Sequence, residues 1–242
     1  MDTVKINSKK TKIIAHRGLS GLECENTCAA FIAAANRSYF GIEADIHKTA
    51  DSQFAVIHDE TTARITLGKS DINVEKSDYT DIQSIILPDT DKSTIRKDLR
   101  IPLLSEYISI CKKYSKTCVL EIKNPFSFKS IKAVIDEIKD SDYLKSVIFI
   151  SFVLENCIRL RRLLPDGDIQ WLLAAPVTEE IIKTLKKHKL DLASHYGFLN
   201  AKVVKNLHSN GIKVNAWTCD DKRTAQKLIV MGVDFITTNI LE

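Results

Sequence analysis

The stretch 12-KIIAHRGLSG-21 starts with a short apolar run that suits a buried β-strand and leads directly into His16-Arg17-Gly18. An imidazole and a guanidinium are costly to leave at the edge of an apolar core without a partner or a task. We therefore expect the end of this strand to carry part of a functional site.

The pattern of this first strand repeats along the chain. Short runs rich in Val, Ile and Leu, typical of strands buried on both faces, alternate with longer amphipathic helical patterns. The expected strands are 12–15, 41–46, 118–123, 147–152, 169–174, 190–195, 213–218 and 233–238. The expected helices are 24–39, 103–115, 128–140, 153–164, 178–188, 200–210 and 220–231.

Eight strands alternating with helices predict an α/β fold, a (β/α)₈ TIM barrel, and the chain length of 242 residues fits that architecture. An open doubly wound sheet is the alternative, but no GxGxxG sequence follows the first strand. We expect a single domain over 1–242. A short strand at 54–58 precedes a polar insertion, 59–100, with one short helix near 79–86.

The composition limits the classes of partner. Lys and Arg number 35 against 31 Asp and Glu, a net charge of +4 that is too small and too scattered to indicate nucleic-acid binding. The polar segment 1–12 lacks the apolar run of a signal peptide, and no stretch approaches the roughly 18 apolar residues of a membrane span. The six cysteines form no CxxC pair, so we expect reduced thiols and a cytoplasmic protein.

Acidic residues gather at the ends of two expected strands. Residues two apart on a strand face the same side, so Glu43 and Asp45 aim at one point, and Glu121 and Lys123 do the same. Three carboxylates facing one cavity repel each other, and a divalent cation relieves that repulsion. Hard oxygen ligands favour Mg²⁺ or Ca²⁺. The alternative is a structural ion network in which Arg17 and Lys123 neutralise the acids.

Two histidines are expected at the same mouth. His16 and His58 have the side chain best suited to hold or release a proton near neutral pH, as a general acid and base. Arg17 suits a phosphate as a bidentate fork, and Lys123 suits it as a point charge. A metal, two imidazoles and two cations together indicate cleavage of a phosphodiester.

An ordered set of motifs resembles the glycerophosphodiester phosphodiesterase family over nearly the whole chain. The motifs are 15-AHRG-18, 25-ENT-27, 43-EAD-45, 58-HD-59, 101-IPLLSE-106, 120-LEIK-123, 215-NAWT-218 and 232-GVDFITT-238. The resemblance implies a (β/α)₈ barrel that hydrolyses small glycerophosphodiesters to glycerol 3-phosphate and an alcohol. It implies His16 and His58 as the acid/base pair, with Glu43, Asp45 and Glu121 as the metal ligands.

The resemblance also implies supporting residues. Arg17 and Lys123 would contact the phosphate, and Trp217 would be the aromatic residue at the substrate mouth, unless it is an ordinary core residue. Glu25 and Asn26 would support the site, although Asn26 equally suits an N-terminal helix cap. Two positions depart from the family pattern: Ser52 replaces a glycine, and Asn239 replaces an aspartate.

Other functions remain open at this stage. A lysophospholipase D or phospholipase C-like enzyme would need an exposed apolar rim, for which the candidates are Leu19, Leu22, Phe126, Phe128 and Phe198. A non-catalytic phosphodiester-binding barrel would keep the fold without the reaction. His47 follows Asp45 by two positions and so could line the cavity, but we expect it at the surface because lone histidines are often incidental. His195 has no assigned place, and the oligomeric state is not determined by the sequence.

Overall fold

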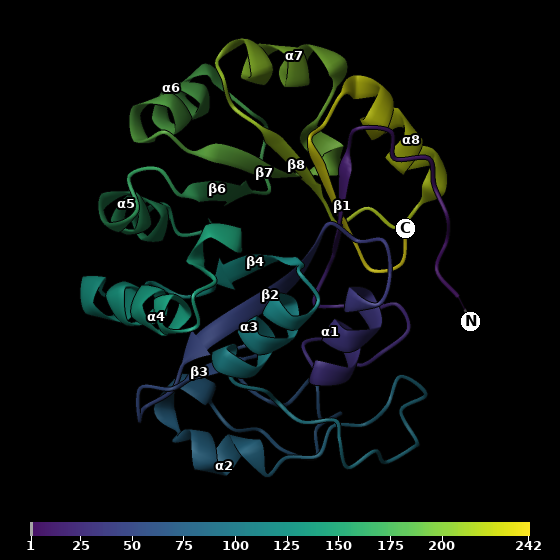
Figure 1. Cartoon of the computed structure of the whole chain (residues 1–242), viewed down its shortest axis with the longest axis vertical. Coiled ribbons are helices and arrows are strands. Elements are labelled where there is room, and N and C mark those ends of the chain that lie inside the picture. Colours follow the sequence, from purple (N-terminus) through teal and green to yellow (C-terminus); the bar gives the residue numbers. More distant parts are fainter. Residues whose placement is uncertain (1) are drawn as a thin grey trace.

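β1 (Lys12–Ala15) pairs in parallel with β2 (Gly41–Lys48) on one side and with β9 (Phe235–Thr238) on the other, and this pairing closes the sheet. The computed structural model describes residues 2–242, and Figure 1 shows the strands surrounded by helices. The predicted (β/α)₈ TIM barrel is confirmed. From β9 back to β2 the parallel order is β8 (Val214–Trp217), β7 (Asp191–His195), β6 (Asp168–Leu173), β5 (Val147–Ser151) and β4 (Thr117–Ile122).

Helices outside the barrel connect successive parallel strands, as the alternating pattern predicted. β3 (Phe54–Val56) is the exception among the strands, because it pairs antiparallel with the end of β2. The connecting helices are α1 (Cys28–Ala35), α3 (Leu104–Lys113), α4 (Phe128–Asp140), α5 (Leu154–Leu163), α6 (Glu179–His188), α7 (Ala201–Ser209) and α8 (Lys222–Met231). Short 3₁₀ turns precede β5 (η2, Leu144–Ser146) and follow β7 (η3, Tyr196–Phe198).

The first helix starts later than the sequence pattern predicted. It begins at Cys28, because Thr27 caps it by accepting the backbone N–H of Ala30 at 3.2 Å. Asn26 precedes this cap with a φ of 55°, a left-handed conformation outside the helix. The cap interpretation of Asn26 is therefore wrong, and its side chain is available for the site.

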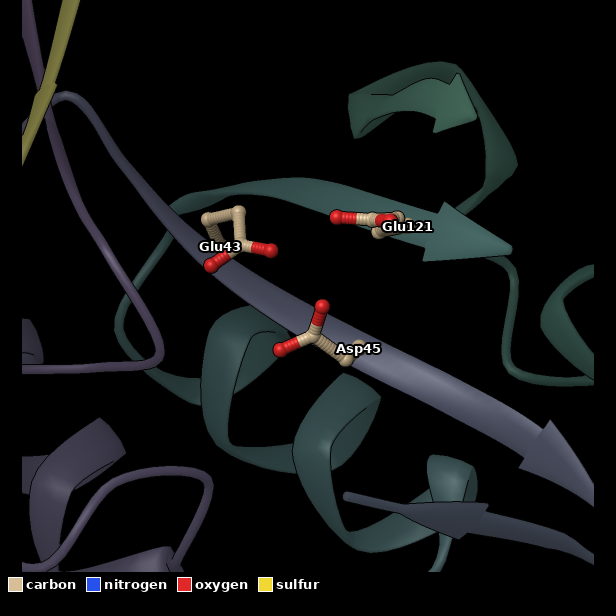
Figure 2. Close-up of side chains that lie close together, drawn as sticks. All are labelled: Glu43, Asp45 and Glu121. Carbon is tan, nitrogen blue, oxygen red and sulfur yellow. The ribbon is translucent and has the colours of Figure 1, made fainter. Parts of the chain in front are cut away.

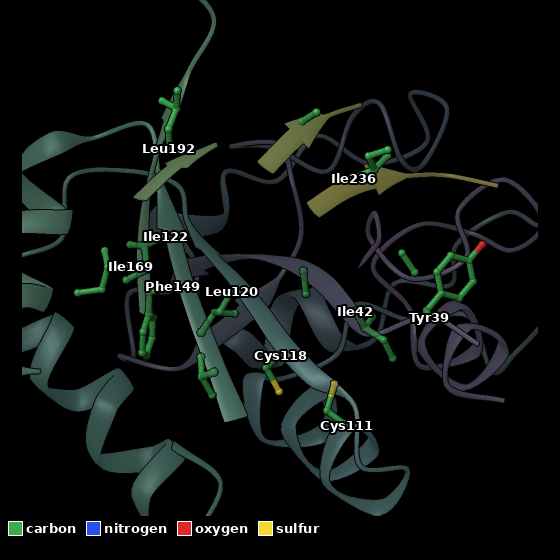
Figure 3. Close-up of a cluster of buried hydrophobic side chains, with 14 of the residues drawn as sticks. Tyr39, Ile42, Cys111, Cys118, Leu120, Ile122, Phe149, Ile169, Leu192 and Ile236 are labelled. Carbon is green, nitrogen blue, oxygen red and sulfur yellow. The ribbon is translucent and has the colours of Figure 1, made fainter. Parts of the chain in front are cut away.

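Side chains alternate between the two faces of each barrel strand. On β2, Ile42 and Ala44 pack outward against the helices, while Glu43 is buried on the opposite face. On β4, Leu120 packs outward and Val119 belongs to the cluster that fills the barrel interior. Figure 3 shows part of the outer layer, which packs the strands against the helices.

The segment 59–100 has a small core of its own. It contains a 3₁₀ turn, η1 (Val74–Lys76), and the helix α2 (Tyr79–Gln83), which is shorter than the predicted 79–86. Its buried side chains pack onto residues of β3 and of the loop after β1, in a cluster of Cys24, Ala55, Ile57, Val74, Ile82, Leu87, Leu99 and Ile101. The segment is thus held against β3 and the loop that follows β1.

Two further expectations concern the whole chain. All six cysteines are free, five of them buried, in agreement with the expected reduced thiols. Among residues 2–242, no helix combines the length and apolarity needed to cross a membrane.

A buried tyrosine joins the two strands that carry the acidic residues. The Tyr107 hydroxyl donates to the carbonyl of Ile42 at 2.7 Å and accepts the N–H of Val119 at 3.1 Å. We expect Tyr107→Phe to lower the free energy of unfolding by about 1–3 kcal/mol, because it leaves a buried N–H and carbonyl without their partner. Urea denaturation would measure this loss. An unchanged midpoint would show that these two groups find other partners.

Candidate active site

Three carboxylates from two neighbouring strands converge inside the barrel (Figure 2). The parallel register of β2 and β4 places Asp45 directly opposite Glu121, and Glu43 lies two residues before Asp45 on the same face. One oxygen of each carboxylate lies within 4.8 Å of an oxygen of the other two, and all three residues are buried. The predicted convergence of these acids is therefore present in the fold.

Burial and mutual repulsion make these acids unequal. Burial, with the charges of Asp45 and Glu121, raises the pKa of Glu43 well above its usual range. Burial and the charge of Asp45 likewise raise the pKa of Glu121 to about 8. Burial also disfavours ionised Asp45, but the positive charges of Lys123 and Arg17 outweigh it and hold the pKa of Asp45 well below its usual range.

Positive side chains only partly neutralise the cluster. Lys123 Nζ lies 2.8 Å from Glu121 Oε1 and 3.4 Å from Asp45 Oδ1, and Arg17 Nε lies 3.4 Å from Asp45 Oδ2. The ion network considered from the sequence is thus present. Two cations still face three carboxylates, and the buried Asp45 Oδ1 accepts no hydrogen bond from any described residue. Three converging carboxyl groups that repel one another when ionised, together with an unpartnered acceptor, fit a divalent cation.

The two predicted histidines are each held through Nδ1. His16 Nδ1 lies 2.8 Å from Asn239 Oδ1, and His58 Nδ1 lies 2.6 Å from Asp59 Oδ1. The amide nitrogen of Asn239 donates to Asp220 at 2.6 Å, which turns its oxygen toward His16. In both rings Nδ1 therefore donates, and Nε2 is left free to accept or release a proton.

Both imidazoles are biased toward the neutral form. Burial is the largest effect lowering the pKa of His16, followed by the charge of Arg17. Burial is also the largest effect lowering the pKa of His58, although the charge of Asp45 opposes it. A neutral imidazole can act as a general base, so this bias suits proton transfer.

The loop after β1 carries several contacts to the acids. Arg17 adopts a left-handed φ of 55° and donates its backbone N–H to Glu43 Oε2 at 2.8 Å. Gly18 follows, and a Cβ on it would lie 2.6 Å from the carbonyl carbon of Ala30, so the chain can make this approach only with glycine. Asn26 Nδ2 donates to Asp45 Oδ2 at 2.8 Å.

Glu25 completes this loop. Its Oε1 accepts a 2.8 Å hydrogen bond from Arg17, and its two oxygens also accept from Arg64 of the segment 59–100. The placement of Glu25 and Asn26 thus agrees with the interpretation that they support the site. The contribution of Arg64 was not anticipated from the sequence.

A cavity of about 180 Å³ joins these groups at the carboxyl ends of the strands. One side is apolar, and there Trp217 meets Phe152 edge to face with ring centroids 5.4 Å apart. Trp217 therefore lines the cavity instead of filling the core. His195, unplaced from the sequence, packs nearly perpendicular to Trp217, with ring centroids 5.6 Å apart. The lining residues include His16, Arg17, Glu43, His58, Glu121, Lys123, Ile150, Phe152, Leu172, Asn215 and Trp217.

One histidine lies where the sequence analysis did not expect it. The prediction that His47 is at the surface is wrong: its side chain is 1% exposed, and its Nε2 lies 3.1 Å from the carbonyl oxygen of His58. The strand period carried the signal, because His47 shares the face of Glu43 and Asp45. The surface was preferred because a lone histidine is often incidental, but β2 continues to Lys48 and so includes this residue.

The two departures from the family pattern have different consequences. Ser52 adopts a φ of 70°, the left-handed region that favours glycine, so the serine strains the turn between β2 and β3. Asn239 lies at the site itself, because it is the partner of His16.

A model of the Glycerophosphoryl diester phosphodiesterase family matches residues 16–242. The chain is 31% identical to a glycerophosphodiester phosphodiesterase of Caldanaerobacter subterraneus, over 95% of this chain and 94% of that protein. It is 30% identical to the putative glycerophosphodiester phosphodiesterase YhdW of Bacillus subtilis, over 94% of this chain and 93% of that protein.

Solved structures agree on the fold. A phosphodiesterase of Oleispira antarctica in complex with sn-glycerol-3-phosphate matches with a TM-score of 0.85 and 24% identity, over 97% of this chain and 95% of that chain. A glycerophosphodiester phosphodiesterase of Parabacteroides distasonis matches with a TM-score of 0.78 and 26% identity, over 95% of this chain and 93% of that chain. The chain belongs to the glycerophosphoryl diester phosphodiesterase family, as its motifs predicted.

The raised pKa of Glu121 gives a testable dependence on pH. In the folded protein this pKa is about 8, against an ordinary value of 4.5, so the folded state holds the proton more tightly. The stability that this proton contributes is complete below about pH 4.5 and is lost as the pH rises toward 8. An ion held by these carboxylates would replace the proton, so Mg²⁺ or Ca²⁺ should raise the melting temperature more at about pH 8 than at about pH 5.5.

Calorimetry with ion and with chelator at each pH would measure this difference. Comparing the melting temperature with ion and with chelator at the same pH limits the contribution of other titrating groups. Glu121→Gln should show a smaller ion effect at the higher pH. An ion effect of equal size at both pH values in the unmodified protein would contradict the assignment.

Proposed function

We propose that this protein hydrolyses small glycerophosphodiesters to glycerol 3-phosphate and an alcohol, with Mg²⁺ or Ca²⁺ held by Glu43, Asp45 and Glu121. Family membership supports the reaction class. The observation that carries the proposal is the single cavity shared by Glu43, Glu121, His16 and His58, with Asp45 beside them. When bound, the ion would supply Lewis-acid stabilisation of the charge that develops on the phosphoryl oxygens.

The phosphate would lie between Arg17 and Lys123. Both side chains are largely buried and both line the cavity, so their charges act in a medium that screens them weakly. Arg17 is fixed by Glu25 and Asp45, and Lys123 by Glu121 and Asp45. Held in this way, the two cations would orient the diester with little rearrangement on binding.

The histidines would move the protons in two steps. In the first, a neutral imidazole accepts the proton of the glycerol 2-hydroxyl on its Nε2 as that hydroxyl oxygen bonds to phosphorus. The other imidazole, which starts protonated on Nε2 as well as on Nδ1, gives its Nε2 proton to the alcohol oxygen as the bond from that oxygen to phosphorus breaks. In the second, water adds to the cyclic phosphate, the bond from phosphorus to the 2-oxygen breaks, and both imidazoles return to their starting states. Asn239 and Asp59 would keep each Nε2 directed at the reacting atoms.

The lipid alternative depends on the rim of the cavity. Of the five rim candidates, Leu19 and Phe126 are buried and Leu22 is partly buried, whereas Phe128 and Phe198 are 47% and 36% exposed. Phe152, which the sequence analysis did not include, lines the cavity and is 43% exposed. A water-soluble diester is the substrate we favour, and a comparison with a lysophospholipid at equal concentration would test the alternative directly.

Removing either histidine should abolish most of the activity. We expect His16→Ala and His58→Ala each to lower kcat by about 10²–10⁴-fold, because each removes one proton-transfer group. The exposed His208 on α7 offers a matched control, and His208→Ala should retain activity. Turnover of glycerophosphocholine with added Mg²⁺ or Ca²⁺ measures all three. Full activity of His16→Ala would remove that residue from the mechanism.

The internal nucleophile makes a separate prediction. A diester whose glycerol part lacks the 2-hydroxyl cannot form the cyclic phosphate, so it should be turned over at least about 10²-fold more slowly than the parent. Competitive binding of the analogue would confirm that it reaches the cavity. Normal turnover would rule out this route and indicate direct attack by water.

A further inference from the structure

The segment 59–100 contributes a charged side chain to the site although it lies outside the barrel. Arg64 follows Asp59 by five residues, and its Nε donates to Asp59 Oδ2 at 2.5 Å. Its two terminal nitrogens donate to the two oxygens of Glu25, at 2.7 and 3.0 Å. One guanidinium therefore joins the carboxylate beside His58 to the loop that follows β1.

Both carboxylates lead directly to groups in the cavity. Asp59 uses its other oxygen to accept a hydrogen bond from His58 Nδ1 at 2.6 Å. Glu25 accepts from Arg17, whose Nε also lies near Asp45. Arg64 thus stands at the centre of a continuous chain of contacts that runs from the imidazole of His58 to the acidic cluster.

We propose that Arg64 is a positioning residue that keeps the His58 ring in the tautomer and orientation needed for proton transfer. This inference rests on the proposed function. An ionised Asp59 can only accept, so while Arg64 holds it in place, His58 carries its proton on Nδ1 and presents Nε2 to the cavity. Without Arg64, Asp59 can turn toward solvent, and the ring can exchange tautomers and rotate.

A simple surface ion pair is the competing explanation, because Arg64 is half exposed. Exposed pairs contribute little to folding. A stability role therefore predicts small effects on every property, whereas a positioning role predicts a small effect on stability and a large effect on turnover. The geometry also separates charge from shape, since a planar fork can reach two carboxylates at once and a lysine ammonium is a single point charge.

Steady-state kinetics on the full chain with glycerophosphocholine and added Mg²⁺ would test the proposal. We expect Arg64→Gln to lower kcat by about 10- to 100-fold with KM changed by less than about threefold, since misplacement of a reacting group affects the reaction more than binding. The kcat of Arg64→Lys should lie between those of the unmodified protein and Arg64→Gln, because lysine keeps the charge but cannot bridge Asp59 and Glu25.

Arg96 offers a matched control within the same segment. It pairs with Glu23, Asp89 and Asp98, none of which contacts the histidines. We expect Arg96→Gln to shift the melting temperature about as much as Arg64→Gln does, while kcat stays within about twofold of the unmodified protein. Equal kcat losses in the two variants would overturn the proposal.

The histidine ring supplies a readout that does not need activity. In ¹⁵N spectra recorded near pH 8, His58 of the unmodified protein should show a protonated Nδ1, and Arg64→Gln should show a mixture of tautomers. His58→Gln would assign the signal. If the unmodified protein turns over no glycerophosphodiester, the proposed function fails. The spectra would still test whether Arg64 fixes the His58 tautomer through Asp59. An unchanged His58 signal together with an unchanged kcat in Arg64→Gln would refute the positioning role.

Discussion

The burial of three carboxylates side by side on β2 and β4 is the constraint on which the rest of the site depends. Their proximity follows from the sheet register, which sets Asp45 opposite Glu121, so the fold itself imposes the repulsion. Arg17 and Lys123 offset only part of that charge. The barrel therefore holds three mutually repelling carboxylates at its centre, and the surrounding groups are arranged to stabilise their charge.

Residues near the cluster act mainly by fixing other residues. Asn26 fixes Asp45, the backbone of Arg17 fixes Glu43, and Asn239 and Asp59 each fix one histidine. Each of these partners lies on a loop or at a strand end, while the acids lie on strands. Rigid strands thus set the positions of the charges, and loop side chains set the directions of the proton-carrying rings.

The insertion contributes contacts to this arrangement. Its small core packs against β3 and the loop after β1, and Arg64 lies between Glu25 and Asp59. A second member of the segment, Glu75, accepts a hydrogen bond from Asn124, and both lie beside the ring of the buried His47. The carbonyl of His58 contacts that same ring. His58 therefore lies between two sets of contacts that both involve the insertion.

Local sequence patterns determined the barrel and most of the acidic site. Apolar runs at regular intervals predicted the strands, and the period of two placed Glu43 and Asp45 on one face, because both properties belong to short stretches of chain. The pattern set the start of α1 four residues early and cut β2 short. Local pattern could not decide between a cap and a site role for Asn26, and His47 was assigned to the surface although its spacing placed it on the face of Asp45.

Only the tertiary structure decided which distant residues meet. Asn239 reaches His16 across 223 residues because β9 closes the barrel against β1, and Arg64 reaches Glu25 because the insertion folds back onto the first loop. Contacts of this kind depend on sheet register and loop packing, which no local pattern in the sequence encodes.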